Sequence, residues 1–177
     1  MNTHRLESTR DCGNCMLCCK LPSIDELNKP EGIWCKHAKL ALGCEIYSER
    51  PVPCREFRCF WLDHSSFDDE WKPNRAGFYM YIKEKTIFVI EDPGRPRAFS
   101  KKEYLVRLRI MADEISQIGG YLIIMNGKRG TLLLPNREIS LGILSGVKEI
   151  RVQRVIRGNV NDYEVELVRG SSGSEIL

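Results

Sequence analysis

The sequence contains no apolar run long enough to cross a bilayer, and its first residues, MNTHRLESTR, contain no hydrophobic segment. The first absence predicts no membrane contact, and the second predicts no secretory signal. We therefore expect a cytoplasmic protein. The formal net charge is only +3, which by itself gives no argument for binding to nucleic acid.

Cysteine is absent after residue 59, and histidine is absent after residue 64. The C-terminal part of the chain therefore shows no Ser-His-Asp set or other catalytic constellation, and the catalytic residues are unknown. The chain also lacks a C-x3-C-x2-C radical cofactor motif, and it has no glycine-rich loop after a strand for S-adenosylmethionine. Whether the protein is an enzyme stays open at this stage.

What the sequence has instead is a concentration of thiols in its first third. A disulfide scaffold would distribute its cysteines over the segments that it joins, and such scaffolds are normally secreted. In a reducing cytoplasm, closely spaced cysteines favour metal ligation over disulfides or over reduced, packed thiols. The candidate metal ligands are Cys12, Cys15, Cys18, Cys19, Cys35, Cys44, Cys54 and Cys59.

The stretch DCGNCMLCCK repeats the C-x2-C spacing, so Cys12, Cys15 and Cys18 can converge on one ion. Three evenly spaced cysteines completed by a distant fourth resemble the nest around a cubane cluster in bacterial ferredoxins. The adjacent Cys19 should point away from Cys18, because neighbouring side chains usually diverge. Cys19 would then face a second centre or cap the first from outside.

The fourth ligand of the first centre is expected from the cysteines at positions 35, 44, 54 or 59. Pro51 and Pro53 predict a helix entry, which would place Cys54 in a first turn where the helix dipole stabilises a thiolate. This makes Cys54 the favoured candidate. Cys59 lies five positions later, about 140° around a helix, so it cannot share a face with Cys54.

Three further residues near the cysteines have open roles. His37 follows Cys35 by two positions and is either a ligand or an ordinary histidine. Arg50 and Arg55 would either donate hydrogen bonds to cluster sulfurs or hold loop carbonyls, and the second role is favoured.

The strings CGNCMLCC, WCKH and GCEIYSERPVPCREFRCFW resemble the YkgJ-type cysteine-cluster proteins. The shared pattern is C-x2-C-x2-C-C followed by C-x-I-Y-x2-R-P-x2-C-R-x-F-x-C, and it covers residues 12 to about 62. Members of this family are described as zinc- or iron-chelating domains and are often labelled iron–sulfur proteins. The resemblance implies metal binding; some longer relatives are implicated in lysine N-methylation of flagellin.

Two functions follow from these patterns. The first is an iron–sulfur or other iron protein with a redox or modification role, which the even spacing of three cysteines favours. The alternative is a zinc-stabilised interaction module without catalytic activity, since the cysteines suffice for two four-cysteine zinc sites. An unknown protein partner is compatible with both.

Residue patterns divide the chain into four segments. Residues 1–62 form the cysteine lobe, and the polar, acidic stretch 63–76 reads as a solvated linker. Residues 77–170 form a sheet region, and residues 171–177 form a disordered tail.

The sheet region predicts an α+β fold. Alternating apolar and β-branched residues predict hairpins in 77–92, reversing near Glu84 and Lys85, and in 121–135, reversing at Asn126 and Gly127. A third hairpin is expected to turn within 158–162. The stretch between the first two predicts one main helix, with a capping box at Ser100 and Glu103 and a stop at Gly119. Its apolar face should contain Leu105, Leu108, Ala112 and Ile115.

The third hairpin is basic, but a solvated sheet face is the usual explanation for such charges. The aromatic side chains that a single-strand nucleic-acid groove needs are missing there, so nucleic-acid binding is not expected. The basic residues are Lys148, Arg151, Arg154, Arg157 and Arg169.

Overall fold

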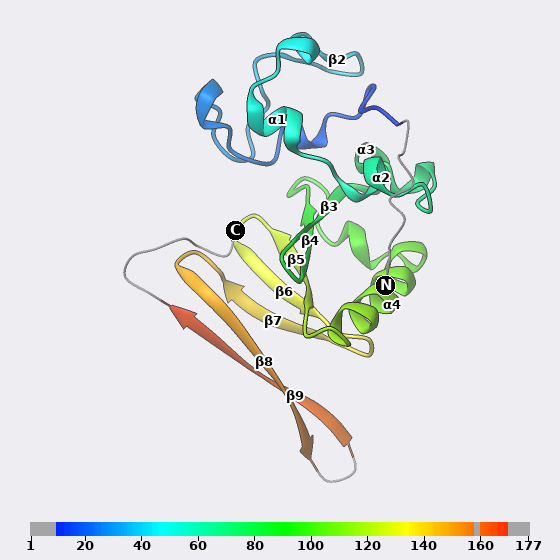
Figure 1. The fold of residues 1–177 in the computed structure, drawn as a ribbon, viewed down its shortest axis with the longest axis vertical. Helices are drawn as coiled ribbons and strands as arrows, with labels where there is room; N and C mark the ends of the chain where they lie inside the picture. The colour runs from blue at the N-terminus through cyan, green and yellow to red at the C-terminus, as the bar shows by residue number, and fades with distance from the viewer. Residues whose placement is uncertain (1–9, 158–159, 170–177) are drawn as a thin grey trace.

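The computed structural model describes residues 10–157 and 160–169 and has the predicted α+β fold. A loop-rich cysteine lobe lies at one end of a five-stranded sheet, the main helix covers one face of that sheet, and a long hairpin extends from the opposite end (Figure 1). Residues 1–9, 158–159 and 170–177 lie outside the described residues. They include the predicted tail at 171–177 and the first two residues of the turn predicted within 158–162.

The five-stranded sheet has the order β3-β4-β5-β6-β7. All its pairs are antiparallel except β4 and β5, which run parallel. A parallel pair needs a crossover, and α4 provides it by returning the chain to the end of the sheet where β4 begins. The sequence predicted neither this parallel pair nor strand β7. The strands are β3 (Phe78–Lys83), β4 (Thr86–Glu91), β5 (Tyr121–Asn126), β6 (Arg129–Leu133) and β7 (Glu138–Ile143).

Both faces of the sheet are buried, as the apolar runs of β4 and β5 require. Alternate residues point to opposite faces: Ile87 and Val89 pack under α4, whereas Phe88 packs on the other face. The second face is closed by Leu141 and Leu144 of the β7 region and by Val147 and Ile150 of the third hairpin, whose strands are β8 (Val147–Arg157) and β9 (Val160–Arg169).

The main helix α4 (Lys102–Ser116) confirms the predicted apolar face, with Leu108, Ala112 and Ile115 buried and Leu105 half-buried. The predicted capping box is wrong. Ser100 lies in the preceding turn η5 (Ala98–Ser100), where its hydroxyl donates to the carbonyl of Arg97, and no side chain caps the helix. The first turn of the helix is held by tertiary packing around Tyr104 instead.

The cysteine lobe consists of short turns joined by loops, as expected of a segment with few apolar residues to bury. Its longest element is α1, a helix of five residues. The elements are η1 (Leu17–Cys19), η2 (Asp25–Leu27), β1 (Ala38–Lys39), β2 (Gly43–Cys44), η3 (Tyr47–Glu49), α1 (Val52–Glu56) and α2 (Phe60–Asp63).

Residues 63–76 are not the solvated connector that their composition predicts. They form η4 (Asp69–Trp71) and α3 (Pro73–Ala76), and they bury Phe67 and Ala76 in the core under α4. Asp68, Asp69 and Glu70 are exposed, but Phe67 and Trp71 face inward. The few apolar residues of this segment, by packing into the core, therefore determine its conformation.

The lobe rests on strand β3. Leu17, Leu21 and Trp61 belong to the same apolar core as Phe78. A salt bridge of 2.6 Å from Lys20 Nζ to Asp92 Oδ1 adds a polar connection to the loop after β4. No helix among the described residues is long and apolar enough to span a membrane.

Candidate metal centre

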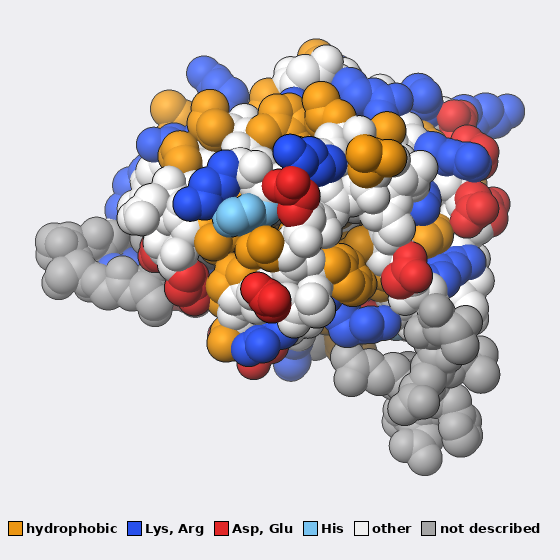
Figure 2. Space-filling view, turned by 90° about the horizontal axis from the view of Figure 1, so that it is seen from above, with side chains coloured by type: hydrophobic (Ala, Val, Ile, Leu, Met, Phe, Trp, Pro, Cys, Tyr) orange, Lys and Arg blue, Asp and Glu red, His pale blue; other side chains and the backbone are white. Residues whose placement is uncertain are grey.

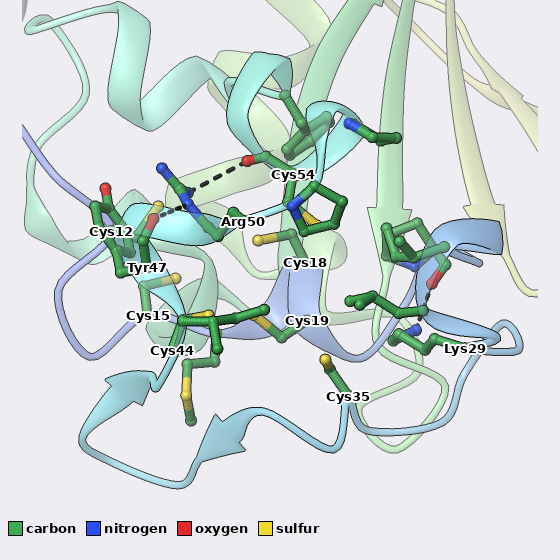
Figure 3. Close-up of a pocket in the computed structure, with 18 of the residues that line it drawn as sticks. Cys12, Cys15, Cys18, Cys19, Lys29, Cys35, Cys44, Tyr47, Arg50 and Cys54 are labelled. Carbon is green, nitrogen blue, oxygen red and sulfur yellow. Dashed lines mark hydrogen bonds between the residues drawn. The ribbon is translucent and has the colours of Figure 1, made fainter.

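The fold gathers all eight cysteines of the lobe around two adjoining cavities. Figure 3 shows the larger one, with Cys12 and Cys15 on one side, Cys18 and Cys19 in the middle, and Cys35 below Cys19. The cavities have volumes of about 70 Å³ and 30 Å³, too small for an organic substrate and suited to ions. All eight cysteines are free of disulfides.

The first group of thiols is Cys12, Cys15, Cys18 and Cys59. A tight turn, in which the Cys15 N–H donates to the Cys12 carbonyl at 2.8 Å, brings the first two together. Cys59 precedes α2, lines the smaller cavity with them, and lies within electrostatic reach of both. Cys54, the fourth ligand that the sequence favoured, lines the same smaller cavity, so the structure brings both Cys54 and Cys59 to this trio.

The second group is Cys19, Cys35, Cys44 and Cys54. A hydrogen bond of 2.9 Å from the Cys35 N–H to the Cys19 carbonyl sets these two cysteines side by side. The β1–β2 pairing then returns the chain so that Cys44 stands opposite Ala38. Cys54 lies in α1 within electrostatic reach of the other three thiols. The Cys35–Cys19 backbone bond, the β1–β2 pairing and the position of α1 therefore assemble this group.

Cys18 and Cys19 do not diverge as expected for neighbouring residues. Both lie in the 3-10 turn η1, and the Cys18 thiol hydrogen-bonds to Cys19. This bond raises the pKa of Cys18 well above its usual value and lowers the pKa of Cys19 to about 7. The two groups of thiols therefore meet at this pair.

Burial dominates the electrostatics of four further thiols. It raises the pKa of Cys59 to about 11 and raises the pKa values of Cys15, Cys44 and Cys54. Cys54 does sit in the first turn of a helix, as predicted, but α1 is too short for its dipole to outweigh burial. Without a positive ion, these thiols are held in the neutral form.

Two cations lie at the second group. Lys29 is only 5% exposed, and its ammonium donates to the carbonyls of Lys20, Pro22 and Pro30. Arg50 donates to the carbonyls of Tyr47 at 2.9 Å and Cys54 at 3.2 Å, so its predicted role in holding loop carbonyls is confirmed. Nothing in the string LNKPEG marks Lys29 as buried, so its place at the second group is not predictable from the sequence.

Aromatic side chains cover the thiols. Phe57 lines both cavities, and Trp61 closes the smaller one. Tyr79 of β3 forms the wall toward the sheet, with its ring centroid 5.2 Å from that of Phe57. His37 lines neither cavity, and the structure gives it no place among the candidate ligands.

The chemistry of the donors fits a soft or borderline metal. Neither cavity is lined by Asp, Glu or His, so thiols are the only strong ligands on offer. Within residues 10–157 and 160–169, no three Cys, His, Asp or Glu side chains already stand as a closed ligand set. Binding an ion would therefore draw the thiols of a group together.

The outer surface of the lobe exposes large apolar side chains. Figure 2 looks onto this end of the molecule and shows hydrophobic side chains interspersed with Lys and Arg. Leu40 is 67% exposed and Leu42 is 84% exposed, in the β1–β2 turn. The other exposed members of this surface are Ile33, Trp34, Tyr47 and Val52.

Comparisons with protein-family models, curated proteins and solved structures give no match to this chain. The resemblance to the YkgJ-type family stays a prediction from the quoted motifs.

Proposed function

We propose that this chain is a cytoplasmic metal-binding protein whose clustered cysteines hold an iron–sulfur cluster or another iron centre, in a redox or modification role. The observation that carries this proposal is the convergence of all eight cysteines on two small cavities that no carboxylate or histidine lines. A chain that merely needed small apolar residues would have no reason to place its thiols together.

Iron is favoured over zinc at the first group. Cys12, Cys15 and Cys18 come from one loop at even spacing, and Cys59 joins them from a distant turn. Aromatic side chains and the core exclude water on the inner side, which protects a cluster from hydrolysis and tunes its potential. An iron–sulfur cluster held there would supply one-electron transfer, while the chain's own residues would hold and shield it.

The alternative is a zinc-stabilised interaction module. The exposed Leu40, Leu42 and Trp34 favour it, because exposed apolar side chains on a small lobe are typical of a protein-binding surface. The partner would be another protein. Both functions use the same thiols, so the identity of the metal separates them.

Metal and acid-labile sulfide content, measured per chain after purification without oxygen, tests the proposal. We expect iron together with sulfide and a coloured protein. Zinc without sulfide would favour the interaction module, and protein that takes up neither metal would contradict both functions. Cys15→Ser is the matched variant: it should lose the first centre, because a serine oxygen is a poor ligand for soft metals.

A further inference from the structure

The second group of thiols is drawn from several separate segments of the cysteine lobe. Its members come from four separate segments: the end of η1, the loop that follows it, strand β2 and the first turn of α1. Cys19, Cys35 and Cys44 line only the larger cavity, whereas Cys59 lines only the smaller one. The remaining cysteines line both cavities: Cys12, Cys15, Cys18 and Cys54. Proximity assigns Cys54 to the second group, because it lies within electrostatic reach of Cys19, Cys35 and Cys44, whereas Cys59 lies within reach of Cys12 and Cys15.

Lys29 gives an independent indication that an anion belongs at the second group. The residue is only 5% exposed, and its ammonium donates to three neutral carbonyl oxygens, those of Lys20, Pro22 and Pro30. No carboxylate in the described part of the chain forms an ion pair with it. The ionisable groups acting most strongly on it are thiols, led by Cys35 and Cys19. A buried cation without a counter-ion is costly.

We propose that Cys19, Cys35, Cys44 and Cys54 form a second four-thiolate metal centre, separate from that of Cys12, Cys15, Cys18 and Cys59, with Lys29 as its counter-charge. This inference rests on the proposed function. Each of the four thiols releases its proton to solvent and bonds to one divalent ion, so the ion with its four thiolates carries a charge of −2. The buried Lys29 and the neighbouring Arg50 offset that charge.

Cobalt(II) titrated without oxygen into the reduced, metal-free full chain counts the centres, because cobalt thiolates are coloured. We expect two ions per chain in the wild type. Cys44→Ser should bind one ion, and so should Cys59→Ser, while the double variant should bind none. Cys35→Ser repeats the test of the second centre at another segment, in case Cys44→Ser disturbs the β1–β2 turn.

Other outcomes distinguish failure of the second centre from failure of the proposed function. One ion in the wild type, lost in both single variants, would overturn the second centre and leave the proposed function standing. Absence of any bound cobalt, zinc or iron would overturn both. Two ions in the wild type that persist in Cys35→Ser and in Cys44→Ser would show that other residues hold the second ion.

Substitution of Lys29 tests the counter-charge. Lys29→Met should weaken binding of the second ion by about tenfold or more, because it removes a nearby buried charge, and should leave the first ion unchanged. Lys29→Arg keeps the charge and should retain most of the affinity. Equal weakening of both ions in Lys29→Met would show that Lys29 supports only the fold of the lobe.

Discussion

Single residues decide how closely the two thiol groups approach each other. Gly43, immediately before Cys44, has φ of +112° and lies against the backbone of Gly13, in the turn between Cys12 and Cys15. A Cβ added to Gly43 would stand 2.9 Å from the Gly13 carbonyl oxygen. The turn that carries Cys44 can therefore reach the turn that carries the first group only because residue 43 has no side chain.

Gly43→Ala should destabilise the metal-loaded lobe by about 1–3 kcal/mol, because it combines an unfavourable backbone conformation with a clash against backbone. Denaturant unfolding of the loaded protein measures the loss. Gly32→Ala is the control, since Gly32 has a positive φ of +73° but no atom within 4 Å of its added Cβ. Equal losses in the two variants would show that the contact between residues 43 and 13 contributes nothing.

At the scale of single residues, the sequence predicts which residues supply thiols but not which thiols lie beside one another. The spacing of Cys12, Cys15 and Cys18 is local, so their proximity could be predicted from a single turn. The position of Cys59 beside them depends on how α1 ends and α2 begins, which spacing along an ideal helix does not describe. Burial of Lys29 depends on three carbonyls of a loop with no regular pattern.

At the scale of elements, the join between the lobe and the sheet contains both apolar and ionic contacts. The Lys20–Asp92 pair is mostly buried, with side-chain exposures of 21% and 13%. Burial alone would raise the pKa of Asp92, but hydrogen bonds from Lys20 and from the Gly94 N–H outweigh it, so the pKa lies below the usual 3.8. A lowered carboxyl pKa stabilises the fold above the unfolded pKa, and this stability is lost as pH falls below it.

Asp92→Asn should therefore lower Tm by about 2–4 °C, corresponding to about 1 kcal/mol. The difference from wild type should be constant between pH 8 and pH 5, because Asp92 is ionised throughout that range. Asp25→Asn, which neutralises an exposed aspartate of η2, is the control and should change Tm little. A difference that already shrinks between pH 7 and pH 5 would contradict the assignment of the lowered pKa.

The strands and the main helix were largely predictable, because alternating apolar residues and turn signals act locally. The reversals at Glu84 and at Gly127 are found where predicted, and both residues have positive φ. The capping box failed because Ser100 was drawn into the turn before the helix. Strand β7 was not predicted, although its sequence EISLGI alternates polar and apolar residues as a half-buried strand does.

At the scale of the whole molecule, the lobe and the sheet depend on different sources of stability. The sheet and α4 bury two apolar clusters, whereas residues 22–56 contribute only Ile24 to the buried apolar residues. A structural metal site typically contributes on the order of ten kcal/mol, which would supply what this segment lacks.

Chelation under reducing conditions should release residues 22–56 and leave the sheet folded, which hydrogen exchange followed by mass spectrometry can measure. The segment containing Phe60, Trp61 and Leu62 is an internal control: it belongs to the core under α4 and should stay protected. Unchanged exchange in residues 22–56 after complete metal removal would show that metal binding and folding of the lobe are not coupled.

The sequence by itself determined that thiols are concentrated in one segment, that an α+β sheet region follows, and that the two have different compositions. These features follow from residue types and local spacing. Only the tertiary structure decided that β4 and β5 run parallel, that residues 63–76 pack into the core, and that Cys59 lines a cavity with Cys12 and Cys15. The physical reason is that each of these outcomes depends on contacts between residues far apart in the chain, where apolar burial and loop geometry outweigh local pattern.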